Sequence, residues 1–114
     1  MTRIEYDEKN LRLKLSGHTG YPSRKGENIV CAAVSILAET LLQNLENFRD
    51  RGWYELEYQY GTPGEMEIHC TVRGYYSMVV EMFRFVMVGM RMIAEEYPQH
   101  VKVIETGGTE DGGV

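Results

Sequence analysis

The spacing of apolar residues switches between strand and helix periods along the chain, and this switching constrains the fold more than any other feature. Leu11, Leu13 and Leu15 alternate with polar residues, which is typical of a strand with one buried face. From residue 29 to about residue 51, apolar residues recur at steps of three and four, as in an amphipathic helix. The same succession returns over 54–72 and 77–97. We therefore expect two hairpins, each followed by a long helix.

The turn and stop signals support these boundaries. The first hairpin turns at residues 7–10, and the second joins strands 54–60 and 66–72 through the turn residues 61–64. Gly52 and Pro98 are expected to end the two helices. A short strand is expected within 100–105.

The element order ββαββα, with hairpins and without βαβ crossovers, predicts an α+β domain. We expect a mainly antiparallel sheet that two helices cover on one face. A chain of 114 residues has room for one core, so 1–105 is predicted to be a single domain. Residues 106–114 are rich in glycine and are predicted to be a disordered tail.

Net charge and cysteine content indicate which class of binding partner and which cellular compartment to expect. Twelve basic and seventeen acidic residues give a net charge of −5, which argues against a nucleic-acid partner and favours a basic peptide or protein. Two cysteines are too few for a disulfide framework, and no segment resembles a signal peptide or reaches the roughly 20 apolar residues of a membrane span. We expect a cytoplasmic protein without membrane association.

The connection between the first hairpin and the first helix carries chemically active residues. Residues 16–35 read SGHTGYPSRKGENIVCAAVS, so His18 directly follows the second strand. If Asn28 is the N-cap, Cys31 is the third residue of the helix. A helix start favours a thiolate over a thiol, because unpaired N–H groups and a partial positive charge gather there.

A loop that turns back from the strand to the helix would bring His18 and Cys31 together as a nucleophilic pair. The loop residues expected to permit this turn, or to contact and gate a substrate, are Gly17, Gly20, Tyr21, Arg24, Lys25 and Gly26. A second interpretation stays open, since a cysteine among Ile29, Val30 and alanines is more often a small buried side chain.

The remaining histidine and cysteine fit structural roles. Cys70 alternates in phase with Met66 and Ile68 and is expected in the core, whereas His69 is expected to face solvent. These residues lack a short paired spacing such as C-x₂-C, so no metal site and no cofactor are expected.

The runs SGHTGY at 16–21 and NIVCAAVS at 28–35 strongly resemble the ribosomal-processing cysteine proteases of the Prp family. The ending EEYPQHVKVIE is also similar, so the resemblance covers nearly the whole chain. It implies a homodimeric endopeptidase that removes a short N-terminal extension from a large-subunit ribosomal protein. In that role Cys31 would be the nucleophile and His18 the general base, with the backbone N–H groups of Cys31 and Ala32 as candidate oxyanion donors.

The sequence departs from the family at Asn28, where the family usually has Asp. Three interpretations are open: Asn28 orients the histidine in place of Asp, neighbouring Glu27 supplies the carboxylate, or activity is reduced. Two other functions also remain, a phage-encoded relative that trims capsid or scaffold protein and a non-catalytic peptide-binding module of the same fold. Neighbouring genes would distinguish the ribosomal-protein protease from the phage-encoded relative, since ribosomal-protein genes are expected beside the first and head-protein genes beside the second.

Overall fold

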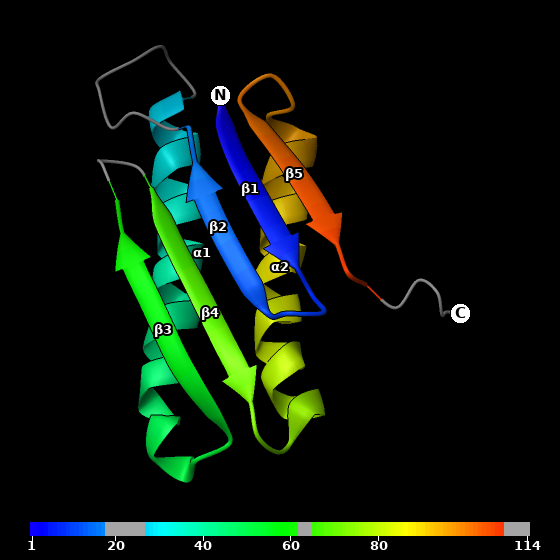
Figure 1. Cartoon of the computed structure of the whole chain (residues 1–114). Helices are drawn as coiled ribbons and strands as arrows, with labels where there is room; N and C mark the ends of the chain where they lie inside the picture. Colours follow the sequence, from blue (N-terminus) through cyan, green and yellow to red (C-terminus); the bar gives the residue numbers. More distant parts are fainter. Residues whose placement is uncertain (18–26, 62–64, 109–114) are drawn as a thin grey trace.

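The structure, a computed structural model, describes residues 1–17, 27–61 and 65–108, with the side chains of Glu27 and Asn28 outside that description. Figure 1 shows the arrangement of its helices and strands. In chain order they are β1 (Thr2–Asp7), β2 (Arg12–Ser16), α1 (Glu27–Asn47), a 3₁₀ turn (Arg49–Arg51), β3 (Tyr54–Tyr60), β4 (Met66–Val72), α2 (Tyr76–Glu96) and β5 (Val101–Thr106).

The sheet has the strand order β3-β4-β2-β1-β5. Every neighbouring pair is antiparallel except β1 and β5, which run parallel. The predicted α+β class with a mainly antiparallel sheet is therefore confirmed. The predicted strands 54–60 and 66–72 coincide with β3 and β4, and the short final strand is β5.

The prediction of a fold without crossovers is wrong. Both β2 and β3 pair antiparallel with β4, so β2 and β3 run in the same direction and α1 is a crossover between them. β4 runs in the same direction as β1, because both are antiparallel to β2, and β5 is parallel to β1. β4 and β5 therefore run in the same direction, and α2 is a second crossover between them. A long helix carries the chain back along the sheet, so the next strand starts at the same end as the previous one.

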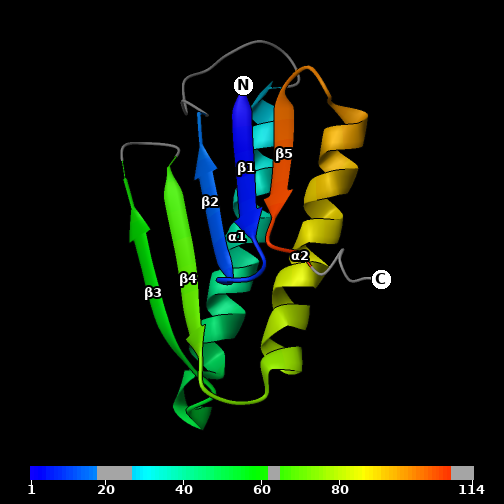
Figure 2. The same cartoon turned by 45° about the vertical axis from the view of Figure 1, so that its right-hand side comes forward.

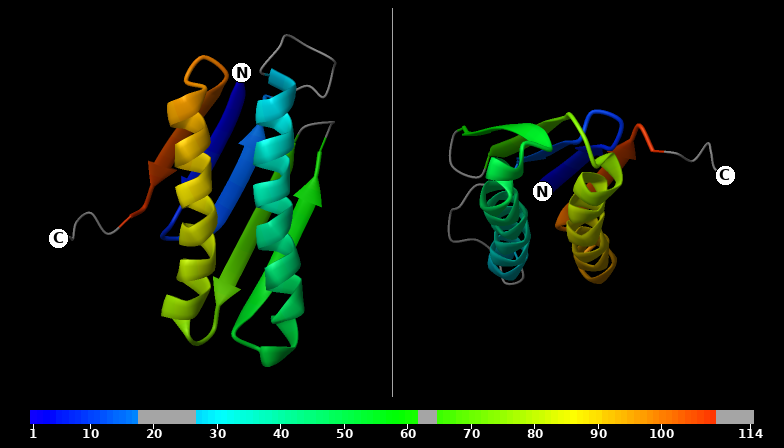
Figure 3. Two further views of the ribbon diagram at one scale, coloured as in Figure 1. Left: turned by 180° about the vertical axis from the view of Figure 1, so that it is seen from behind. Right: turned by 90° about the horizontal axis from the view of Figure 1, so that it is seen from below.

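Both helices lie against one face of the sheet, as Figures 2 and 3 show. The helix layer and the inner face of the sheet bury one continuous core. Its largest fully buried side chains are Phe83, Ile4, Leu11, Leu13, Leu41, Leu45, Ile68, Met87, Met90, Val30, Val34 and Val79. This two-layer arrangement leaves the opposite face of the sheet open to solvent.

The end of α1 differs from the sequence prediction of one helix to residue 51. The helix ends at Asn47 and a separate 3₁₀ turn follows, closed by Gly52 at φ 76° with its N–H bonded to the Arg49 carbonyl at 3.2 Å. Gly52 therefore ends this segment as predicted, because glycine adopts the left-handed conformation without a side-chain clash.

The C-terminal boundary lies slightly beyond the predicted domain limit. Thr106 is the last residue of β5, and its carbonyl accepts a hydrogen bond of 2.9 Å from the Glu8 N–H, so Thr106 belongs to the sheet and not to the predicted tail. Residues 109–114 of that tail lie outside the described residues.

One helical segment of the described chain, Ile29–Arg51, is long and apolar enough by length and composition to cross a membrane. The core helix of a two-layer domain meets the same criteria. Here the apolar face of α1, including Val30, Val34 and Leu41, is buried in the core.

Candidate active site

Gly17 fixes the direction in which the chain leaves β2. Its φ is +84°, and a Cβ atom added there would meet the Met1 carbonyl oxygen. Only glycine fits this conformation and this close approach. His18 is the next residue, and it lies outside the described residues together with the predicted loop residues Gly20, Tyr21, Arg24, Lys25 and Gly26.

The start of α1 differs from the sequence prediction. Glu27 is the first helical residue, so the prediction that Asn28 precedes the helix is wrong, and Cys31 is the fifth helical residue instead of the third. Residue preferences alone could not separate these two starts, because an acidic residue is as favourable in the first helical turn as Asn is before it.

Cys31 lies at the border between the core and the surface. Its side chain is half-buried, the preceding Val30 is fully buried, and the following Ala32 is exposed. The side chain is therefore not enclosed in the core. The alternative interpretation of Cys31 as a small buried side chain required it to be enclosed. Its position one turn inside the helix lies beyond the first turn, where the field of the helix dipole is strongest.

The same start affects the predicted oxyanion donors. In an α-helix each N–H is directed at the carbonyl four residues earlier. A helix that begins at Glu27 therefore offers the N–H groups of Cys31 and Ala32 acceptors at Glu27 and Asn28. The oxyanion role of these two groups stays a prediction, and the observed helix start makes it less favourable than the predicted start did.

A row of side chains that the sequence prediction did not include begins at Cys31. Ser35 and Glu39 follow at steps of four along α1; Ser35 is half-buried and Glu39 is exposed. The Tyr60 hydroxyl of β3 donates a 2.9 Å hydrogen bond to the Glu39 carboxylate. The four-residue spacing is visible in the sequence, but only the fold shows that this row meets the edge strand β3.

Cys70 is a core residue, as predicted. Its side chain is buried on the inner face of the sheet, and burial raises the pKa of its thiol to about 12. The backbone N–H of Cys70 donates to the Leu11 carbonyl at 3.0 Å. A thiol in this environment is protonated at neutral pH and is a poor nucleophile.

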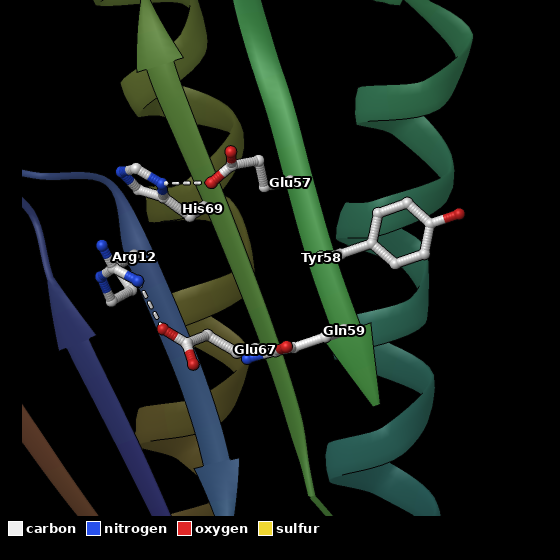
Figure 4. A pocket seen from close by; sticks show the side chains of 6 residues that line it. All are labelled: Arg12, Glu57, Tyr58, Gln59, Glu67 and His69. Atoms are coloured by element: carbon white, nitrogen blue, oxygen red, sulfur yellow. Dashed lines mark hydrogen bonds and ion pairs between the residues drawn. The ribbon is translucent and has the colours of Figure 1, made fainter. Parts of the chain in front are cut away.

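A hollow of about 230 Å³ lies over β2, β3 and β4, and Figure 4 shows its lining residues. On the outer face of the sheet, Arg12 pairs with Glu67 at 2.5 Å, and the Nδ1 atom of His69 is 3.5 Å from the Glu57 carboxylate. His69 therefore lies on the outer face, although its neighbours cover much of its ring. Tyr58 belongs to the opposite side of β3 by alternation and pairs in register with the buried Ile68, and its ring extends past the edge of the strand (Figure 4). The sheet separates this charged cluster from the helix layer that carries Cys31.

Within the described ranges, no group of three or more His, Cys, Asp or Glu residues is placed to hold a metal ion.

Comparison with known proteins identifies the family. The family model for cysteine protease Prp matches residues 1–102. The fold is similar to SMU.848 from Streptococcus mutans, with 27% sequence identity, a TM-score of 0.72, and coverage of 92% of this chain and 91% of that one. It is also similar to the essential ribosomal processing protease Prp from S. aureus in complex with a substrate peptide, with 16% identity, a TM-score of 0.76, and coverage of 93% and 100%. No curated protein matches the chain. Because the family model spans almost the whole chain, the chain belongs to the cysteine protease Prp family.

Proposed function

We propose that this chain is a cysteine endopeptidase with Cys31 as nucleophile and His18 as general base. The observation that carries the proposal is the position of Cys31, half-buried one turn inside α1, the first helix after His18 in the sequence. The end of β2 and the start of α1 lie at the same end of the molecule (Figure 2), and His18 lies between them in the sequence. Membership of the Prp family supports the same chemistry.

In the proposed reaction, His18 takes the proton from the Cys31 Sγ atom, and the thiolate attacks the scissile carbonyl carbon. The carbon–nitrogen bond then breaks, and His18 returns the proton to the departing amine, which leaves a thioester on Cys31. Water hydrolyses that thioester, with His18 as base, and restores the thiol. The backbone N–H groups of Cys31 and Ala32 are the proposed donors to the oxyanion, which they would share with the helical carbonyl acceptors of Glu27 and Asn28.

We propose that Asn28 or Glu27 orients His18. An amide at position 28 can hold the imidazole in one tautomer but adds no negative charge, whereas a carboxylate at position 27 would also stabilise the imidazolium. Asn28 and Glu27 belong to the first turn of α1, three and four residues before Cys31 respectively, which supports a role beside the thiol.

The proposed substrate is the short N-terminal extension of a large-subunit ribosomal protein, cleaved in the cytoplasm. The similar S. aureus protein is a ribosomal processing protease that was observed with a substrate peptide. The net charge of −5 also suits a basic substrate.

We also propose that the protein is a homodimer. The outward side of α2 exposes large apolar residues at heptad-like spacing, with Phe85 76% and Met92 63% exposed and Val88 between them. Ile36 of α1 adds to the apolar surface of the same helix layer. A second copy of the chain would cover this surface.

The function is tested by intact-mass spectrometry of a peptide that spans the N-terminal extension of the host ribosomal protein. The peptide is incubated with the native chain, with Cys31→Ala and with Cys70→Ala, which removes the other thiol. The proposal expects one cut by the native chain and by Cys70→Ala, and none by Cys31→Ala. Cleavage by Cys31→Ala would overturn the assignment of the nucleophile, and binding without cleavage by any form would indicate a peptide-binding module.

A further inference from the structure

Two tyrosines on the edge strand β3 are exposed where their neighbours are buried. Tyr54 and Leu56 lie on the face of β3 that packs toward α1, and both are almost completely buried. Tyr58 and Tyr60 follow on the same face, since side chains of a strand alternate, yet they are 44% and 56% exposed. The helix layer therefore stops covering the edge of the sheet at these two rings.

The two rings form an ordered surface. Their centroids are 6.2 Å apart in an edge-to-face arrangement, and the Tyr60 hydroxyl is held by Glu39 of α1 at 2.9 Å. An aromatic pair fixed in this way loses little conformational freedom on binding another side chain, and the negative charge of Glu39 beside it favours a cationic neighbour. We call Tyr58, Tyr60 and Glu39 the edge-strand surface.

The edge-strand surface is within reach of a peptide bound at Cys31. Glu39 is eight residues after Cys31 on α1, a rise of about 12 Å at 1.5 Å per residue. An extended chain advances about 3.3 Å per residue, so a substrate bound at Cys31 covers this distance in about four residues. β3 is also at one edge of the sheet, where backbone N–H and C=O groups are open to pairing with an extended peptide.

A hollow of about 260 Å³ continues this surface at the ends of the strands. Tyr60, Leu15 and Met66 give it apolar walls, and Glu65 and Lys14 are among its charged lining residues. β2, which contributes Leu15, ends at Ser16 shortly before His18. The hollow therefore connects Tyr60 with the end of β2, and its lining residues Gln59 and Glu67 extend it onto the outer face of the sheet.

We propose that the edge-strand surface is a specificity-determining part of the substrate site. It holds the substrate side chain about four residues from the scissile bond, and it selects a large apolar or aromatic residue there, with a basic residue beside it. This inference rests on the proposed function, because it uses Cys31 as the point of cleavage.

The test is a position scan with a peptide that the native chain cleaves. A single Phe is placed in turn at each of the five positions before and after the cut, and kcat/KM is compared with that of the same peptide carrying Ala. The native chain is expected to prefer Phe about tenfold at one position about four residues from the cut, and Tyr58→Ala is expected to lose that preference.

Matched variants separate binding from folding. Tyr60→Phe keeps the ring and loses only the hydroxyl bonded to Glu39, so the Phe preference should stay within about twofold of the native value. Tyr76→Ala removes a tyrosine of similar exposure at the start of α2, at the opposite end of the molecule from Cys31 (Figure 1), and should leave the preference unchanged. Glu39→Lys should lower kcat/KM for a peptide with Lys beside the Phe, and high salt should reduce that difference.

A Phe preference that survives Tyr58→Ala, or that Tyr76→Ala removes equally, would overturn the inference. If no peptide is cleaved, the proposed function fails, and the surface is then tested by fluorescence anisotropy of labelled peptides of the scan with the Cys31→Ala chain. Weaker binding of the Phe peptide by the Tyr58→Ala form of that chain would support the surface independently of cleavage. Equal binding of the Phe and Ala peptides at every position would contradict it.

Discussion

At the scale of single residues, the two cysteines show how far the sequence predicts chemistry. The alternation of Cys70 with Met66 and Ile68 predicts a core thiol, and the structure confirms it, because a strand fixes which side chains face the core. Cys31 could be placed near a helix start, but its exact turn could not be predicted, since several residues of that segment are equally suited to begin a helix. The structure places Cys31 two residues farther into the helix than predicted and leaves it half-buried.

The two thiols are expected to react at different rates. Burial raises the pKa of Cys70 to about 12, so its thiolate is scarce at neutral pH, and the enclosed sulfur is also shielded from reagents. Iodoacetamide at pH 7 should modify Cys31 well before Cys70, and denaturant should make both react. Peptide mapping after timed quenching measures the two rates, and equal modification in the folded chain would contradict the assignment of Cys70 to the core.

Gly17→Ala is expected to destabilise the chain by about 2 kcal/mol or more, because Gly17 has a φ of +84° and a Cβ would meet the Met1 carbonyl oxygen. Urea unfolding of both forms measures the change in the free energy of unfolding. Gly52→Ala is a matched control, since Gly52 also has positive φ but no atom within 4 Å of an added Cβ, so it should cost less. Equal losses for both variants would contradict the contact with Met1.

At the scale of elements, periodicity predicted each strand and helix but not the way they connect. The spacing of Leu11, Leu13 and Leu15 reports only which side of a strand is buried, and it carries no information about which strand lies next to it. The crossovers around α1 and α2 therefore could not be predicted from local pattern. The exposure of the Tyr58 and Tyr60 rings also depends on where α1 leaves the edge of the sheet, so the alternation of the strand alone could not predict it.

The ion pair between Glu8 and Arg84 of α2 should make the free energy of unfolding depend on pH. Glu8, in the turn after β1, is buried and accepts hydrogen bonds from Tyr6 at 3.1 Å and from Arg84 of α2 at 2.9 and 2.8 Å. The hydrogen bonds from the Arg84 guanidinium hold the pKa of Glu8 below its usual value. Because the folded-state pKa is depressed, the stabilisation is present above the unfolded pKa and is lost as pH falls through the folded pKa.

Glu8→Gln is therefore expected to lower the free energy of unfolding by about 2 kcal/mol at pH 7 and by less as the pH falls below that of the unfolded carboxyl. Urea unfolding of the native and variant chains at pH 7 and pH 3 measures this difference. Glu5→Gln, at an exposed carboxylate on the outer face of β1, is the control and should change little at either pH. The same loss for Glu8→Gln at both pH values would contradict the ion pair with Arg84.

At the scale of the whole molecule, the helix layer has one face buried against the sheet and one face exposed to solvent. The helix layer and the inner face of the sheet share one cluster of buried residues. The helical period of the sequence places Phe83 and Met90 on one side of α2, and the structure buries both. It exposes the apolar residues outside that stripe, which are Met78, Phe85, Val88 and Met92. The exposed group is the surface proposed for the dimer.

Phe85→Glu is expected to convert a dimer of the native chain into a monomer without unfolding it, because a buried charge at the interface would lack a partner. Light scattering after size-exclusion chromatography measures the mass, and circular dichroism checks the fold. Lys102→Glu, an exposed charge change on the outer face of the sheet, should leave the native mass unchanged. A dimer that persists in Phe85→Glu would place the interface elsewhere.

The central claim is that the thiol of Cys31 carries out peptide cleavage, and progressive alkylation tests it most directly. The native chain is treated with iodoacetamide for increasing times, and each sample is divided between peptide mapping and the peptide-cleavage assay. We predict that cleavage activity falls in direct proportion to the fraction of Cys31 modified while Cys70 is still intact. A chain fully modified at Cys31 that still cleaves the peptide would contradict this account.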